Sequence, residues 1–229
     1  MLKVKIFTLY PESFPGLLDS GIYKKARNKN IWDMEIIDIR DFATDKHGTV
    51  DDTPFGGGSG MLIKPDILAK ALDSNIKNNN EKKIFLSPAG KKFDQITAKK
   101  LSKEKKINII CGHFEGVDQR LLETRNIEQV SLGDYVLSGG ESATYVLLDA
   151  VLRLLPGVLG NKLSSIDESF ENGLLEYPQY TKPQKWEEKR VPAVLLSGDH
   201  AKIKGWRLTQ SEAITRRQRP DLWKKYKKK

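Results

Sequence analysis

The sequence predicts an α/β protein with a mainly parallel sheet covered by helices on both faces, followed by a small, mostly helical C-terminal domain. Two observations predict the first part. Short apolar strands alternate with helical segments over residues 1–155, and glycine-containing turns follow several of the strands. A third observation, the distribution of charge, sets the C-terminal part apart. Residues 181–229 hold 15 Lys or Arg and 5 Asp or Glu, a net charge of +10, whereas residues 1–180 carry a net charge of −1.

The individual elements are predicted from hydrophobic periodicity. Apolar runs predict five strands, at residues 2–9, 34–39, 84–86, 107–111 and 129–132. Apolar residues at helical spacing predict helices within residues 11–30 and at 65–76, 93–101, 117–123, 141–155 and 203–217. Pro220 ends the last of these helices. Residues 40–60 are polar and end in a glycine run, which is typical of a lid or a binding loop.

A break in this pattern predicts the domain boundaries. Pro156, Gly157 and Gly160 interrupt the alternation, and residues 161–172 are Ser-rich and acidic with little apolar material to bury. We therefore expect a catalytic domain at residues 1–160, a flexible linker at 161–172 and a basic helical domain at 173–229.

Composition excludes several classes of protein. Cys111 is the single cysteine and the three histidines are scattered, so neither an internal disulfide nor a structural zinc site is expected. No apolar run approaches the 18 or so residues that span a membrane, and the first ten residues do not resemble a signal peptide. The sequence thus predicts a cytoplasmic protein that does not associate with membranes.

Three strand ends carry residues suited to ligand binding. Glycine and short polar residues follow the strands at residues 86–90, 111–116 and 132–140, where ligands bind in open α/β sheets. A glycine after one strand is usually only a turn, but three such ends in succession favour one pocket. The glycine run at residues 56–60 follows a loop and does not match a phosphate-binding loop, so it is interpreted as a hinge or a lid.

The basic C-terminal segment is typical of an RNA-binding surface. Lysines and arginines are interleaved there with Trp206 and Trp223, which supplies cations for phosphates and aromatic rings for stacking. The simpler alternative, a solvated basic helix with a frayed end, stays open for the final six residues.

Five segments of the chain are distinctive when they are taken together: residues 51–61, 86–90, 111–118, 133–141 and 173–181. In this order and spacing, they closely resemble the bacterial tRNA (guanine-N1)-methyltransferases, members of the knotted SPOUT superfamily. The resemblance covers nearly the whole chain, and its most specific part is Gly133–Glu141.

The resemblance implies a deep trefoil knot, an obligate homodimer and methyl transfer from S-adenosylmethionine to guanine 37 of tRNA. It also implies a dependence on Mg²⁺, for which the sequence shows no ligand cluster. Carried over position by position, it predicts the cofactor-binding residues Leu86, Ser87, Gly112, Glu115, Leu132, Gly133, Asp134, Tyr135, Val136, Leu137, Gly139 and Gly140.

The resemblance implies a catalytic set of Glu168, Arg153 and Asp51. A carboxylate must remove the N1 proton of guanine, and an arginine can stabilise the charge that develops on the neighbouring carbonyl oxygen. Glu168 stands where the family commonly has aspartate, so the adjacent Asp167 is the alternative base. From composition alone, acids in such a linker are more often only solubilising.

Two other differences from the family pattern lie next to the second glycine-containing turn. His113 and Phe114 stand where arginine and tyrosine are common.

Two rival functions stay open at this point: a related knotted enzyme that methylates ribose or another base, and a non-catalytic protein that binds RNA through its basic segment alone.

Overall fold

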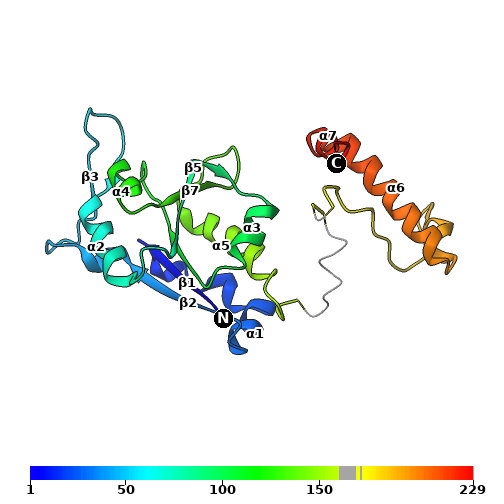
Figure 1. Cartoon of the computed structure of the whole chain (residues 1–229), viewed down its shortest axis with the longest axis horizontal. Helices are drawn as coiled ribbons and strands as arrows, with labels where there is room; N and C mark the ends of the chain where they lie inside the picture. The colour runs from blue at the N-terminus through cyan, green and yellow to red at the C-terminus, as the bar shows by residue number, and fades with distance from the viewer. Residues whose placement is uncertain (160–168, 171, 229) are drawn as a thin grey trace. The chain divides into compact units, whose positions relative to one another are not determined.

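The computed structural model describes residues 1–159, 169–170 and 172–228. Contacts between residues divide the chain into two compact units, Met1–Gly160 and Asn161–Lys229. Figure 1 follows the chain from its N-terminus (blue) through the first unit to the helices of the second (orange and red). Each unit is described by itself.

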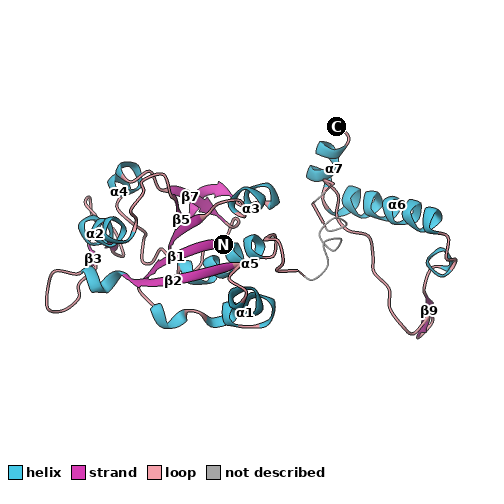
Figure 2. Ribbon diagram, turned by 60° about the horizontal axis from the view of Figure 1, so that its bottom comes forward, coloured by secondary structure: helices cyan, strands magenta, loops and turns pink. Residues whose placement is uncertain are grey.

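A five-stranded parallel sheet forms the centre of the first unit (Figure 2). Its strands are β1 (Leu2–Thr8), β2 (Trp32–Asp38), β5 (Lys82–Lys92), β6 (Lys106–Ile110) and β7 (Glu128–Ser131). They lie in the order β2-β1-β6-β5-β7, and every neighbouring pair is parallel. The prediction of five strands in a mainly parallel sheet is confirmed.

Helices cover both faces of this sheet, as expected. Alternate residues of each strand point to opposite faces, so Val4 and Ile6 join one core while Phe7 joins the other. The first core contains residues of α1 (Gly21–Asn28), α3 (Gln95–Leu101) and α5 (Gly140–Leu152). The second contains residues of α2 (Pro65–Asn75) and α4 (Gln119–Thr124).

The helix expected within residues 11–30 is shorter than the periodicity suggests. The 3₁₀ turns η1 (Pro11–Ser13) and η2 (Gly16–Asp19) precede α1. Pro15 has no amide hydrogen to donate and Gly16 has φ of +46°, so a regular helix cannot pass through this point.

The second face of the sheet is apolar only over its carboxyl half. Toward the amino ends of the strands, polar side chains including Lys5, Glu35 and Asn108 line a second cavity. Its acids are paired, with Lys5 Nζ lying 3.0 Å from Glu35 and Lys106 Nζ 2.7 Å from Glu81. These ion pairs give the polar patch a structural explanation.

The polar stretch at residues 40–60 is mostly irregular but contains elements that periodicity does not predict. The 3₁₀ turn η3 (Ile39–Phe42) comes first, and β3 (Asp51–Asp52) then pairs antiparallel with β4 (Leu62–Ile63). Between β3 and β4, Gly56, Gly57, Gly58 and Gly60 all have positive φ. Such short strands carry too few residues for a pattern to form.

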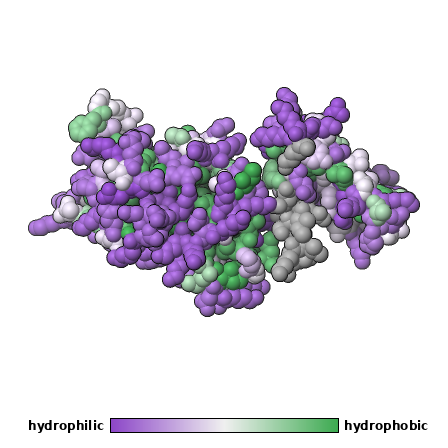
Figure 3. All heavy atoms as spheres, viewed as in Figure 1, coloured by the Kyte–Doolittle hydropathy of each residue, from purple (hydrophilic) through white to green (hydrophobic). Residues whose placement is uncertain are grey.

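The described part of the second unit is mainly helical. A short hairpin of β8 (Lys185–Trp186) and β9 (Lys189–Arg190) leads to the turn η4 (Ala193–Leu196), α6 (His200–Gln218) and α7 (Pro220–Tyr226). Pro220 ends α6 as predicted, but it also begins α7, since proline fits the first position of a helix. The hairpin and α7 were not predicted from sequence. The face of this unit seen in Figure 3 is largely hydrophilic.

Candidate active site

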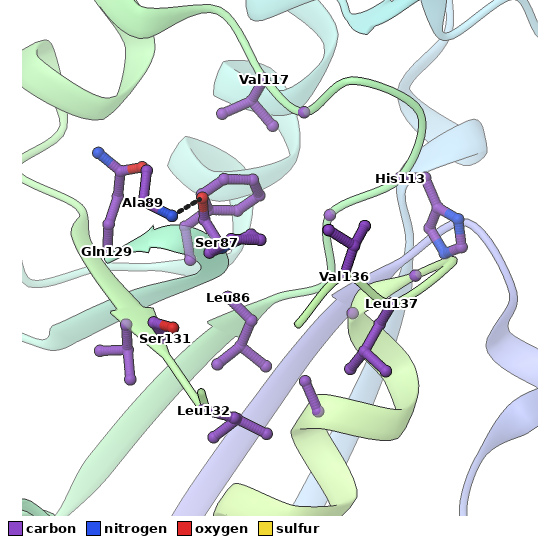
Figure 4. A pocket seen from close by; sticks show the side chains of 18 of the residues that line it. Leu86, Ser87, Ala89, His113, Val117, Gln129, Ser131, Leu132, Val136 and Leu137 are labelled. Carbon is purple, nitrogen blue, oxygen red and sulfur yellow. Dashed lines mark hydrogen bonds between the residues drawn. The ribbon is translucent and has the colours of Figure 1, made fainter. Parts of the chain in front are cut away.

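A cavity of about 400 Å³ lies at the carboxyl ends of β6 and β7 and beside the middle of β5 (Figure 4). Three segments line it, at residues 85–89, 112–117 and 129–140, together with a few side chains of α4 and α5. Its volume is in the usual range for small-molecule sites. The three strand ends singled out from the sequence therefore do form one cavity.

Eleven of the twelve predicted cofactor-binding residues line this cavity. The exception is Asp134, which is exposed at the turn between Gly133 and Tyr135. Further lining residues lie outside the segments predicted to bind a ligand, among them Phe85, Gln129 and Ser131. Their proximity to the glycine-containing turns is the signal that identifies them. His113 and Phe114 also line the cavity, and both belong to the predicted turn at residues 111–116 without being predicted as cofactor contacts.

The first cavity segment is an interruption within β5 rather than its end. β5 pairs with β7 on both sides of the interruption, and the register shifts between Leu86 and Lys91. The chain at Ser87 bulges into the cavity, and the Ala89 amide donates a hydrogen bond to Ser87 Oγ at 3.2 Å, drawn dashed in Figure 4. At Gly90 an added Cβ would lie 2.3 Å from the Val130 backbone nitrogen, so this path requires glycine.

The second and third segments touch each other through glycines. The Gly140 amide donates a hydrogen bond of 2.8 Å to the Gly112 carbonyl. A Cβ at Gly140 would lie 2.6 Å from both Cys111 Cα and the Gly112 nitrogen, and one at Gly112 would lie 2.7 Å from the Phe85 ring. This close approach of backbone to backbone shapes the cavity wall.

The glycine run before β4 is anchored at the cavity rim. The Glu115 amide donates to the Met61 carbonyl at 2.9 Å, and Gly60 lies so close to the Glu115 side chain that a Cβ would be 2.5 Å from Cγ. Asp51 pairs with Ile63, which forms a parallel bridge with Val117 of the cavity lining. The predicted catalytic residue Asp51 is therefore separated from the cavity rim by one strand, β4.

Arg153 lies at the far end of α5 from the cavity. It is the C-cap of that helix, whereas the cavity wall is formed at the helix start by Gly139 and Gly140. A helix of 13 residues is about 20 Å long. One chain therefore does not bring Arg153 to its own cavity. The other predicted catalytic residue, Glu168, and its alternative Asp167 lie outside the described residues.

The cysteine next to the cavity is not a candidate nucleophile. Burial raises the pKa of the Cys111 thiol far above its usual value, and the charge of Glu141 adds to this effect. The thiol therefore stays protonated at neutral pH, where only a thiolate would react.

The part of the chain that the structure describes contains neither a metal site nor a membrane span. There, no three His, Cys, Asp or Glu side chains gather in a way that could hold a metal ion. Within the same residues, no helix is both long and apolar enough to cross a membrane.

These features define a parallel α/β protein with a small-molecule cavity at the strand ends and a separate, basic, mainly helical unit. A family model described as "tRNA (Guanine-1)-methyltransferase TrmD" matches residues 2–225, and the chain belongs to this family.

Curated relatives agree with the family assignment. The chain is 69% identical over 228 residues to a tRNA (guanine-N(1)-)-methyltransferase of Pelagibacter ubique, with 100% of both chains covered. It is 51% identical to the protein of that name from Bartonella tribocorum, covering 99% of this chain and 97% of the relative. For the Rhizobium etli relative of that name the identity is 50%, with 97% and 96% covered.

Proposed function

We propose that this protein transfers a methyl group from S-adenosylmethionine to N1 of guanine 37 in tRNA. The observation that carries the proposal is the single cavity formed by three glycine-containing segments in a chain of this family. S-adenosylmethionine supplies an activated methyl group on a cationic sulfur. A tRNA substrate is in keeping with the names of the relatives.

The cavity residues suit such a cofactor. The glycines at positions 112, 139 and 140 place backbone instead of side chains at the cavity wall, and the apolar side chains of the lining can take up an adenine ring. Glu115 lies at the same cavity and places a carboxylate where a cationic group can be attracted. Asp134, exposed between the lining residues Gly133 and Tyr135, is proposed as a further contact at the edge of the cavity.

The acid–base chemistry is proposed to come from Glu168 and Arg153. Guanine N1 carries a proton, and a carboxylate that removes it makes the nitrogen nucleophilic. The Arg153 guanidinium, which keeps its charge, stabilises negative charge on the adjacent carbonyl oxygen. Asp51 is the third proposed member of this set, and Asp167 is the alternative base.

We propose that two copies of the chain form a homodimer with shared active sites. The support is the separation of about 20 Å along α5 between Arg153 and the cavity wall, which a second copy would overcome. Apolar side chains on the first unit are also exposed, with Val136 at 86%, Leu17 at 71% and Val146 at 55%. Sedimentation should give a dimer at micromolar concentration, and a monomer would contradict shared sites.

The other features implied by the family resemblance are proposed for this chain as well. The deep trefoil knot would lie in residues 1–160, where the third cavity segment returns to the backbone at Gly112. The linker at residues 161–172 would join this catalytic domain to the tRNA-binding domain at 173–229, and the cytoplasm would be the site of action. The described residues do not provide a Mg²⁺ site, so no step is derived through that ion.

The second unit is proposed to bind the tRNA. Arg216 and Arg217 are exposed near the end of α6. Elsewhere in this unit, Arg207 lies 4.8 Å from the centre of the Tyr177 ring, and the Tyr180 and Trp206 rings are 6.2 Å apart. Cations beside aromatic rings are typical of surfaces that bind RNA.

Replacing Arg216 and Arg217 together with alanine should weaken tRNA binding. Its binding should also depend less on salt. The negative slope of log affinity against log salt concentration should become shallower by about 0.7 to 0.9 for each phosphate that the variant no longer neutralises. Titrations of tRNA at several salt concentrations measure both effects. The matched control replaces Lys103 and Lys105, which are exposed in the first unit, and should change neither quantity. An unchanged affinity and slope in the arginine variant would show that this surface does not bind tRNA.

Incubation with undermodified tRNA and a labelled methyl donor, followed by nucleoside analysis, tests the proposed function. The expected product is 1-methylguanosine at position 37. A methyl group on a ribose hydroxyl or on another base would favour the related knotted enzymes. Binding of tRNA without any methyl transfer, and without stabilisation by S-adenosylmethionine, would favour a non-catalytic RNA-binding protein.

A further inference from the structure

The wall of the cavity depends on how firmly the start of α5 is held against the turn after β6. The Gly140 amide bonds to the Gly112 carbonyl at 2.8 Å, and no side chain separates the two backbones. This one hydrogen bond joins the second and third cavity segments directly. The side chains around it therefore decide whether the wall keeps its shape.

The side chain of Glu141 links three segments at this point. Its Oε2 lies 2.7 Å from His113 Nε2, on the turn after β6, and its Oε1 accepts a hydrogen bond of 2.5 Å from Thr8 Oγ1, at the end of β1. Glu141 itself belongs to the first turn of α5. Only 12% of its side chain and 13% of that of His113 are exposed. Because an ionised carboxylate only accepts hydrogen bonds, His113 Nε2 must donate.

The groups that face this pair come from every neighbouring segment. The Tyr10 ring lies 4.7 Å from the His113 ring, and the Tyr10 amide donates to Thr8 Oγ1 at 2.9 Å. Cys111 and Tyr145 are close enough to Glu141 to feel its charge. Burial is the main reason why the pKa values of both groups are raised, and the charge of Glu141 contributes to both. In Figure 4 His113 and Leu137 lie on the same side of the cavity.

We infer that Glu141 is a positioning residue for cofactor binding, and that its hold on the cavity wall is strongest when His113 is protonated. The inference rests on the proposed use of S-adenosylmethionine. The carboxylate already makes this hydrogen bond charge-assisted, and a proton on His113 adds the attraction between two opposite charges. A guanidinium at the same position would keep its charge at any pH used here. Cofactor affinity should therefore fall as pH rises and the imidazole loses its proton.

The experiment compares the affinity for S-adenosylmethionine at about pH 6 and about pH 8.5 in the full-length wild type and in His113→Arg. Calorimetric titration measures each dissociation constant. The ligand also titrates in this range, but that contribution is common to both proteins and cancels in the comparison. The loss of affinity between the two pH values should be about three- to tenfold larger in the wild type.

Two further variants separate positioning from general stability. Glu141→Gln keeps the shape of the side chain but removes its charge, so it should bind the cofactor more weakly at pH 6 and lose the extra pH dependence. His200→Arg makes the same change as His113→Arg at an exposed position in the second unit, outside the cofactor cavity, and should bind the cofactor like the wild type. Thermal unfolding of every variant checks that each is folded under the conditions of the titration.

The outcomes distinguish this inference from the proposed function. Equal pH dependence in the wild type, His113→Arg and Glu141→Gln would overturn the role of the pair, while cofactor binding itself would stand. Absence of S-adenosylmethionine binding by the wild type at pH 6 would instead overturn the proposed cofactor, and the inference with it. If His113→Arg does not fold, the comparison of the wild type with Glu141→Gln decides the question.

Discussion

Glu168→Gln should lower kcat for methyl transfer by about 10²- to 10⁴-fold, because an amide cannot remove the N1 proton of guanine. The affinities for S-adenosylmethionine and for tRNA should stay close to those of the wild type, since glutamine has nearly the same shape. Single-turnover assays with labelled methyl donor measure the rate, and equilibrium titrations measure the two affinities.

The adjacent acid provides a matched control for this variant. Asp167→Asn makes the same chemical change one residue earlier and should keep most of the activity. If Asp167→Asn loses activity and Glu168→Gln does not, Asp167 is the base. If neither variant is impaired, the proton is removed by another group, and the proposed mechanism is wrong.

Gly140→Ala should strongly destabilise the first unit and distort the cavity wall. Its new Cβ would lie 2.6 Å from Cys111 Cα and from the Gly112 nitrogen, and both are backbone atoms. Cys111 cannot move aside easily, because its amide donates to the Phe7 carbonyl at 2.9 Å within the sheet. Overpacking of this kind costs about 3 kcal/mol of stability, and the distorted wall should also weaken cofactor binding more than tenfold.

A second helical glycine gives the control for this prediction. At Gly205, in α6, an added Cβ would meet no atom within 4 Å. Gly205→Ala should therefore leave stability unchanged or raise it by about 0.5 to 1 kcal/mol, as alanine favours helix. Urea denaturation measures both variants. If the two lose the same stability, the contact between the two backbones does not constrain the cavity wall.

Much of the first unit follows from local patterns. Alternation along Leu2–Thr8 puts Leu2, Val4 and Ile6 on one buried face of a strand, and apolar spacing in Pro65–Asn75 gives a helix with one buried side. The patterns did not predict the hairpin Lys185–Arg190 or the helix Pro220–Tyr226. Two-residue strands are too short for a period to appear, and Pro220 was interpreted only as a stop.

The site was predicted in part for a related reason. Glycine-containing turns after strands identify the edge of the sheet that can hold a ligand, and those segments do line one cavity. The interruption inside β5 was not predicted, because its two halves are held in one strand by pairing with β7, which is distant in the sequence.

By itself, the sequence determined the five strands of the sheet and most of the longer helices, which turns contain glycine beside the cavity, and that positive charge gathers at the C-terminal end of the chain. These properties are set by each residue and its near neighbours. Only the tertiary structure decided the strand order β2-β1-β6-β5-β7, the contact of Gly140 with Gly112, and the position of Arg153 one helix length from the cavity. Such features depend on pairings between residues far apart in the chain, whose geometry no local pattern encodes.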